Sequence, residues 1–230
     1  MVVPTALKIL ALTDIHDKVS SLTSILDSVL RAKQIDLITV SGDVSHFGGG
    51  EDVERVLRLI EKTGVPFCYV LGNCDPIESR NGVNVSGKCV ESACGAFSGI
   101  NIIGSGGATP TPFDTPFEVS EEEIVGNVAR SISECCGSGC TGPMMLLMHN
   151  PPRGEVVDRL RTGLHGGSKK LRDLILKSSP LLVQCGHIHE APGVERIGRS
   201  VVFNPGPALR GNYALVEIEG ESVNVVLGTV

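Results

Sequence analysis

Short apolar runs alternate with helix-period segments along the first third of the chain. Lys8–Thr13, Asp36–Val40 and Pro66–Leu71 have the character of buried strands, whereas Val19–Lys33 and Val53–Lys62 repeat apolar residues at helical spacing. A strand–helix–strand order of this kind favours parallel strands joined by right-handed crossovers. We therefore expect an α/β fold.

The rest of the chain adds two more helices and much β-structure. The expected helices run from Ser120 to about Glu134 and over Ser168–Lys177, and the expected strands are Val83–Val90, Ile100–Gly104, Met144–Met148, Leu181–Cys185, Val194–Ile197, Ser200–Phe203, Tyr213–Ile218 and Val223–Leu227. No repeat, charge block or linker interrupts this order. We expect one domain over residues 1–230, with its two β-rich halves forming two packed sheets.

Charge and hydropathy exclude several classes of function. Lys and Arg number 20 against 26 Asp and Glu, a formal net charge of −6, which offers no basic stripe for nucleic acid. The early apolar run Ile9–Leu12 is far shorter than the roughly 20 residues of a membrane-spanning helix, and no signal-peptide order precedes it. We therefore expect a soluble, cytoplasmic protein without a membrane or nucleic-acid partner.

Polar residues follow the carboxyl ends of five expected strands, the edge at which open α/β sheets bind ligands. These residues are Asp14, His16, Asp43, Asn73, His149, His187 and His189. The glycines before Asp43, Asn73 and His187 allow tight turns there. Imidazole, carboxylate and amide oxygen, without a nearby set of thiolates, suit Mn, Fe, Zn or Ni. The joint pattern predicts a metal site.

The set D-x-H, G-D, G-N, H and G-H-x-H resembles the calcineurin-like metallophosphoesterase superfamily, over nearly the whole chain. The resemblance implies a four-layer α/β/β/α sandwich with two mixed β-sheets, the metallo-dependent phosphatase fold. It also implies two bound divalent metal ions. We expect Mn to be the metal that activates the protein. By this resemblance, one ion would be bound by Asp14, His16 and His189, the second by Asn73, His149 and His187, and Asp43 would bridge both.

Hydrolysis of a phosphate ester is the activity that the resemblance implies. A hydroxide held between the two metals would attack phosphorus, because metal binding lowers the pKa of water toward neutrality. Asp43 would be the catalytic bridge, and Asp75 is expected to orient a group around the ligands. We expect the substrate to be a small phosphate ester or nucleotide, and a diester rather than a monoester.

One position departs from the common pattern of the family. Many members carry His directly after the ligand Asn, whereas this chain has Cys74, and its G-N-C-D resembles a subgroup of small prokaryotic and archaeal phosphodiesterases. A thiol with an ordinary pKa of about 8.5 is a poorer acid than an imidazolium at neutral pH, so we expect faster turnover of substrates with good leaving groups. Two histidines are candidates for the acid that protonates the leaving group. They are His46, in a Gly-rich loop, and His165, in H-G-G-S before a helix.

Further segments near the expected site have alternative interpretations. Arg153 suits a substrate phosphate or is an exposed residue without a role, and Ser168 suits a helix N-cap. The loop Thr109–Glu118 holds two of the six Phe residues. It is either a lid that stacks on a substrate ring or a proline-stiffened connection that packs its own Phe side chains. Asn204–Pro207 matches a family segment and is expected to act through backbone shape.

The chain has eight cysteines. Cys68 and Cys185 lie in strand-like runs and are expected to be buried. Cys135, Cys136 and Cys140 share a Gly-rich loop but lack the paired spacing of a structural zinc site. We expect free thiols there, with a disulfide as the alternative in a hyperthermophile.

Other functions remain open to the sequence. The ligand set permits a phosphomonoesterase or nucleotidase equally. A non-catalytic metal-binding scaffold is the alternative from another class, although scaffold relatives tend to lose a ligand and this chain retains all seven. A homodimer formed through the β-rich tail is a further open alternative.

Overall fold

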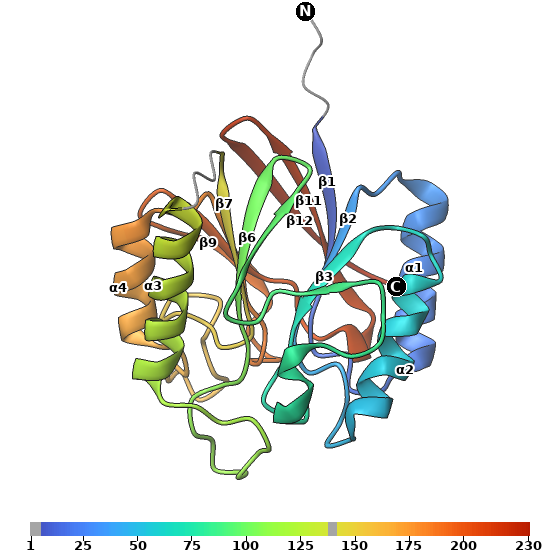
Figure 1. The fold of residues 1–230 in the computed structure, drawn as a ribbon, viewed down its shortest axis with the longest axis horizontal. Coiled ribbons are helices and arrows are strands. Elements are labelled where there is room, and N and C mark those ends of the chain that lie inside the picture. Colours follow the sequence, from blue (N-terminus) through green and yellow to red (C-terminus); the bar gives the residue numbers. More distant parts are fainter. Residues whose placement is uncertain (1–5, 138–141) are drawn as a thin grey trace, which may run out of the picture.

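A computed structural model describes residues 6–137 and 142–230 and has four layers (Figure 1). Two sheets lie face to face in the middle. The helices α1 (Val19–Ala32) and α2 (Gly50–Glu61) cover the outer face of the first sheet, and α3 (Glu121–Gly137) and α4 (Lys169–Ser178) cover that of the second. The predicted α/β/β/α sandwich is confirmed. No helix in the described part of the chain is long and apolar enough to cross a membrane.

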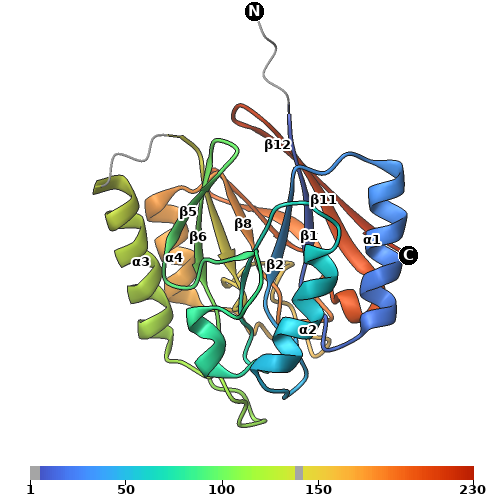
Figure 2. The same ribbon diagram turned by 45° about the vertical axis from the view of Figure 1, so that its right-hand side comes forward.

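The first sheet has the strand order β12–β11–β1–β2–β3–β4. Its strands are β1 (Leu7–Leu12), β2 (Leu37–Ser41), β3 (Phe67–Val70), β4 (Lys88–Cys89), β11 (Asn212–Glu219) and β12 (Ser222–Thr229). The strands from β1 to β4 run parallel, whereas β11 pairs antiparallel with β1 and with β12, so the sheet is mixed. Figure 2 shows α1 and α2 in front of its strands.

The second sheet has the strand order β5–β6–β7–β8–β10–β9. Its strands are β5 (Cys94–Phe97), β6 (Ile100–Ser105), β7 (Met144–Met148), β8 (Leu182–Gln184), β9 (Gly193–Ile197) and β10 (Ser200–Asn204). The four central strands are parallel, and the edge strands β5 and β9 are antiparallel to their neighbours. Two short 3-10 helices, η1 (Ile77–Asn81) and η2 (Ala208–Arg210), lie in the connections.

Three apolar layers hold the sandwich together. Ile9 and Ile102 belong to the layer between the two sheets. Leu22 and Val56 bring α1 and α2 onto the first sheet, and Ile124 brings α3 onto the second. Because the central strands are buried on both faces, they are mostly apolar rather than alternating, which is why their positions can be predicted from the sequence.

The predicted strand Val83–Val90 is largely wrong. Only Lys88–Cys89 of this segment forms a strand, paired with β3. The backbone amide of Val83 donates instead to the hydroxyl of Tyr69 at 3.2 Å. A side chain therefore satisfies a backbone amide that a strand ladder would otherwise use, and the apolar alternation of the segment does not produce a strand.

A disulfide joins Cys94 of β5 to Cys135 of α3, with the two Cα atoms 6.0 Å apart. The expectation of a free thiol at Cys135 is therefore wrong. The two residues are 41 positions apart, so no local spacing marks the pair. Cys136 is free and exposed, and Cys140 lies outside the described residues. The buried free cysteines are Cys68, Cys74 and Cys185.

Candidate metal centre

The candidate ligands lie just after the carboxyl ends of strands from both sheets. The loops after β1, β2 and β3 carry Asp14, His16, Asp43 and Asn73, and those after β7 and β8 carry His149, His187 and His189. Asp14, His16, Asp43 and His187 have φ angles of 51°, 46°, 49° and 67°. Non-glycine residues adopt this left-handed region at an energetic cost. Such strain persists only where surrounding structure enforces it, as at functional sites.

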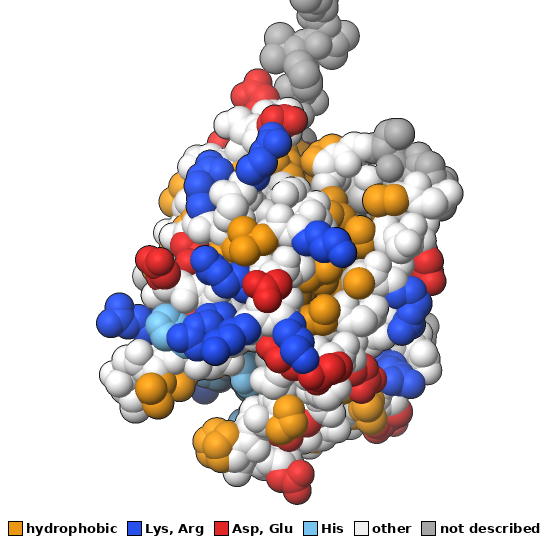
Figure 3. Space-filling model, turned by 90° about the vertical axis from the view of Figure 1, so that its left-hand side faces the viewer, with side chains coloured by type: hydrophobic (Ala, Val, Ile, Leu, Met, Phe, Trp, Pro, Cys, Tyr) orange, Lys and Arg blue, Asp and Glu red, His pale blue; other side chains and the backbone are white. Residues whose placement is uncertain are grey.

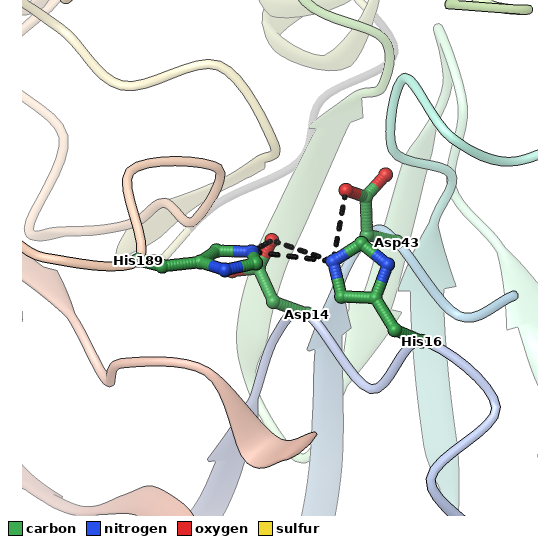
Figure 4. Close-up of side chains that lie close together, drawn as sticks. All are labelled: Asp14, His16, Asp43 and His189. Atoms are coloured by element: carbon green, nitrogen blue, oxygen red, sulfur yellow. Dashed lines mark hydrogen bonds and ion pairs between the residues drawn. The ribbon is translucent and has the colours of Figure 1, made fainter. Parts of the chain in front are cut away.

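Asp14, His16, Asp43 and His189 point toward one another (Figure 4). Each offers one ligand atom, and these atoms lie within 4.8 Å of one another. Nε2 of His16 is 3.2 Å from Nε2 of His189, which in turn is 3.2 Å from Oδ1 of Asp14. This Oδ1 is buried and has no hydrogen-bond partner among the described residues. A cation would satisfy the buried oxygen, so these four residues fit a metal ion.

His149 and Asn73 form a second group of ligand atoms. Nδ1 of His149 lies 2.8 Å from the carbonyl oxygen of Ser41, which only accepts, so Nδ1 of the neutral ring carries the proton and Nε2 presents a lone pair. This Nε2 is 2.9 Å from Oδ1 of Asn73, and the ring of His187 lies 5.1 Å from that of His149 between centroids. Two acceptors at this distance repel each other unless a cation lies beside both. This donor set also fits a metal ion.

Asp43 faces both groups. Its Oδ2 lies 3.4 Å from Nε2 of His16, and its Oδ1 lies 3.5 Å from Nε2 of His149. The backbone amide of Cys74 donates to Oδ1 at 2.8 Å, and the carboxylate is 2% exposed. A buried carboxylate between two sets of ligand atoms has the geometry of a bridging ligand.

Burial and neighbouring charges set the pKa values of the cluster. Burial raises the pKa of Asp43 to about 7. Burial also opposes ionisation of Asp14, but the close contact with His189 and the charges of nearby histidines outweigh it and hold the pKa of Asp14 well below its usual range. Burial lowers the pKa of His16 to about 4 and that of His187 to about 3. Both rings are therefore neutral near pH 7, the form in which imidazole binds a metal.

Two glycines leave the space that the ligands occupy. Gly42 has a φ of +94°, and a Cβ there would lie 2.5 Å from Nδ1 of His149, so it serves both as a turn and as a point of close approach. A Cβ at Gly72 would collide with Oδ1 of Asp43. The glycine before Asn73 is therefore required by the space around the carboxylate rather than by a tight turn.

Buried polar side chains support the ligand loops. Asp75 accepts from the amides of Val44 at 3.0 Å and Gly72 at 2.8 Å, and so ties the loop after β2 to the loop after β3. Nδ2 of Asn204 donates to the carbonyl of Ile188 at 3.0 Å, between the two histidines of the G-H-x-H segment. The segment that begins at Asn204 therefore acts through a side chain as well as through backbone shape.

The candidate acids lie in different surroundings. Cys74 is 7% exposed, and burial raises the pKa of its thiol. Nδ1 of His46 lies 3.2 Å from Nδ1 of His16, and His46 is exposed. Nδ1 of His165 lies 2.9 Å from Oδ1 of Asp158, a fully buried carboxylate. Asp158 is not among the residues that the sequence predicts at the site, because a lone Asp in a loop carries no motif.

The loop Thr109–Glu118 combines features of both interpretations. Phe117 is 3% exposed and belongs to the core, whereas Phe113 is 79% exposed. Nδ2 of Asn73 donates to Oγ1 of Thr115 at 3.0 Å, so the loop contacts a candidate ligand. No sequence pattern singles out Thr115.

The remaining predicted residues lie beside helix α4. Oγ of Ser168 accepts from the amide of Leu171 at 2.9 Å, which confirms the N-cap. The amide of Arg153 donates to the carbonyl of Ser168 at 2.8 Å. Contact of the Arg153 side chain with a substrate stays a prediction. In the space-filling view, histidine side chains show at a hollow in the surface, with Lys and Arg side chains nearby (Figure 3).

Known proteins resemble this chain in sequence and in fold. An uncharacterized protein of Methanocaldococcus jannaschii is 33% identical over 210 residues, covering 87% of this chain and 88% of its own length. A protein of Synechococcus, named a probable cyclic nucleotide phosphodiesterase, is 24% identical over 163 residues, covering 70% of this chain and 61% of its own. The crystal structure of TT1561 of Thermus thermophilus superposes with a TM-score of 0.75 at 19% identity, covering 98% of this chain and 99% of its own.

Residues 7–221 match the family model of the calcineurin-like phosphoesterase superfamily domain. The chain belongs to this superfamily, as the resemblance of its polar motifs implies.

Proposed function

We propose that this member of the superfamily is a dinuclear metal-dependent phosphodiesterase acting on a small phosphate ester or a nucleotide. The position of Asp43 carries the proposal, because its two oxygens face two separate groups of ligand atoms at 3.4 and 3.5 Å. The similarity to a protein named a probable cyclic nucleotide phosphodiesterase supports a diester substrate. We propose Mn as the activating metal and the cytoplasm as the location.

One metal position would be held by Asp14, His16 and His189, and the other by Asn73, His149 and His187, with Asp43 shared. When bound, a pair of divalent ions supplies an activated nucleophile and neutralises the oxygens of the phosphate. The chain's own residues orient the ligands. The carbonyl of Ser41 keeps Nε2 of His149 free to bind.

The proposed acid is His46, with His165 as the second candidate. His46 is exposed and contacts His16, so a substrate held at the cluster would lie within its reach. His165 is oriented by the buried carboxylate of Asp158. Cys74 is assigned a supporting part through its backbone amide, which donates to Asp43.

The test is hydrolysis of bis-p-nitrophenyl phosphate and p-nitrophenyl phosphate after chelation and readdition of Mn. We expect turnover of the diester that needs Mn and is lost in Asp43→Ala. A preference for the monoester would instead favour a phosphomonoesterase or nucleotidase. A folded protein that binds two ions and hydrolyses neither substrate with any divalent metal would favour the scaffold.

A further inference from the structure

The loop Thr109–Glu118 is bonded to Asn73 through side chain and backbone. Nδ2 of Asn73 donates to Oγ1 of Thr115 at 3.0 Å, and the amide of Phe117 donates to the carbonyl of Asn73 at 3.0 Å. Thr115 is 8% exposed, so water does not readily replace it as a partner. The orientation of the Asn73 amide therefore depends on this loop.

The direction of these hydrogen bonds follows from Glu118. Oγ1 of Thr115 lies 2.8 Å from Oε1 of Glu118, and an ionised carboxylate only accepts. Thr115 therefore donates its single hydroxyl proton to Glu118, and Oγ1 of Thr115 can only accept a hydrogen bond from Asn73. The amide of Asn73 must turn its NH2 group to Thr115, which leaves Oδ1 facing His149 at 2.9 Å.

Glu118 is held ionised by the loop itself. Its Oε1 accepts from the amide and hydroxyl of Thr111 and from those of Thr115. Burial opposes ionisation, but these hydrogen bonds outweigh it and lower the pKa of Glu118 to about 2. The carboxylate therefore remains an acceptor at any pH near neutrality.

The same loop is tied to the residue that follows His149. The amide and hydroxyl of Thr109 donate to Oδ1 of Asn150 at 3.0 and 3.3 Å. Among the described residues, no hydrogen bond of the loop reaches Asp14, His16 or His189. In the described part of the chain, the hydrogen bonds of the loop therefore reach one group of ligands and not the other.

We propose that Thr115 and Glu118 are positioning residues that hold Oδ1 of Asn73 toward one metal position, so that this loop supports one of the two ions selectively. The inference rests on the proposed function, because it assumes that Asn73 binds a metal ion. The two metal positions would therefore differ, because the loop Thr109–Glu118 orients a ligand of one position and, among the residues that the structure describes, no ligand of the other.

The experiment is a titration of the protein with Mn after chelation, in which electron paramagnetic resonance measures free Mn. The wild type is expected to bind two ions. Thr115→Val should bind one ion as tightly as the wild type and the second about 10- to 100-fold more weakly, the usual effect of removing a partner of a metal ligand. Thr115→Ser keeps the hydroxyl and should restore the second ion. Thr111→Val is the matched control, because Thr111 bonds to Glu118 without touching Asn73, and it should resemble the wild type.

Glu118→Gln provides a second route if Thr115→Val does not fold. The amide of Gln can donate to Oγ1 of Thr115, whose own proton is then free to donate to Asn73. Thr115 then no longer determines which end of the Asn73 amide faces it. Glu118→Gln should weaken the same ion. Two wild-type affinities in Thr115→Val, or equal weakening of both ions, would overturn the inference and leave the proposed function standing. A wild type that binds no Mn would overturn both, so the two failures are distinguishable.

Discussion

Oδ2 of Asp43 lies 3.4 Å from Nε2 of His16. The second oxygen of the same carboxylate lies 3.5 Å from Nε2 of His149, on the side of the other ligand group. A substitution of Asp43 therefore affects both groups of ligand atoms. By contrast, a substitution that removes the hydrogen bond between Asn73 and Thr115 affects one group.

Replacing Asp43 should weaken both metal positions together. We expect Asp43→Asn to reduce the affinity for each Mn ion by at least about 100-fold, the upper end of the effect of removing an outer partner, and to abolish diester hydrolysis. Equilibrium dialysis with metal analysis measures the bound ions. Asp27→Asn, on the exposed face of α1, is the control and should bind two. Loss of a single ion in Asp43→Asn would contradict a bridging role.

The layers of the fold could be predicted because the strands that build them are buried on both faces. Ile9 and Leu37 lie in continuous apolar runs, and the parallel order follows from the helices between those runs. The strand expected at Val83–Val90 could not be judged in this way, because the hydroxyl of Tyr69 provides a partner that no local pattern reveals. Similarly, the bond between Cys94 and Cys135 depends on how β5 lies against α3.

The candidate ligands could be recognised from spacing, but their supports could not. Asp14 and Asp43 each follow a strand directly, so the end of the strand determines where they lie. Thr115 comes from a loop that contacts Asn73 across 42 residues, and the sequence carries no information on such a contact. Asp158 is linked to the site by its hydrogen bond to His165, which no sequence pattern marks.

Substitution of His46 should affect poor leaving groups most. A general acid contributes about 10²–10⁴-fold, and a leaving group that departs readily as an anion needs it least. We expect the wild type to hydrolyse aryl diesters faster than alkyl diesters, and His46→Ala to lower kcat by about 10²-fold or more for alkyl diesters and far less for p-nitrophenyl diesters. Steady-state kinetics on both classes, with His165→Ala as the comparison, measures this. An equal loss on both classes would assign His46 only to the support of His16.

Loss of the disulfide should destabilise the fold. The bond between Cys94 and Cys135 closes a loop over a separation of 41 residues, and constraining the unfolded chain in this way is worth about 4 kcal/mol. We expect the double variant Cys94→Ala/Cys135→Ala to lose about this amount in urea unfolding, whereas Cys136→Ala, at an exposed free thiol, should not. A reductant should lower the stability of the wild type toward that of the double variant. No effect of reductant would show that the bond does not form in solution.

A buried carboxylate outside the cluster should make stability depend on pH. Oε1 of Glu91 accepts from the amide of Gly106 at 2.8 Å, but Oε2 is buried with no hydrogen-bond partner in the described residues. Burial raises the pKa of Glu91 from 4.5 to about 7. Between these values the folded chain retains a proton that the unfolded chain releases, so this group makes the folded state less stable as pH rises through the window.

Glu91→Gln removes that titration and preserves an oxygen to accept from Gly106. The rise in the pKa of Glu91 from 4.5 to about 7 corresponds to a change of at most about 3 kcal/mol in the free energy of unfolding. From pH 4.5 to pH 8, the free energy of unfolding of the variant should therefore rise relative to that of the wild type by up to this amount. Urea unfolding of both proteins at several pH values in this range measures the difference, and contributions from all other groups cancel in it. Glu134→Gln, at an exposed position on α3, is the matched control for the exchange of a glutamate for a glutamine. A difference for Glu91→Gln that does not change with pH would mean that Glu91 ionises in the folded protein as it does in the unfolded chain.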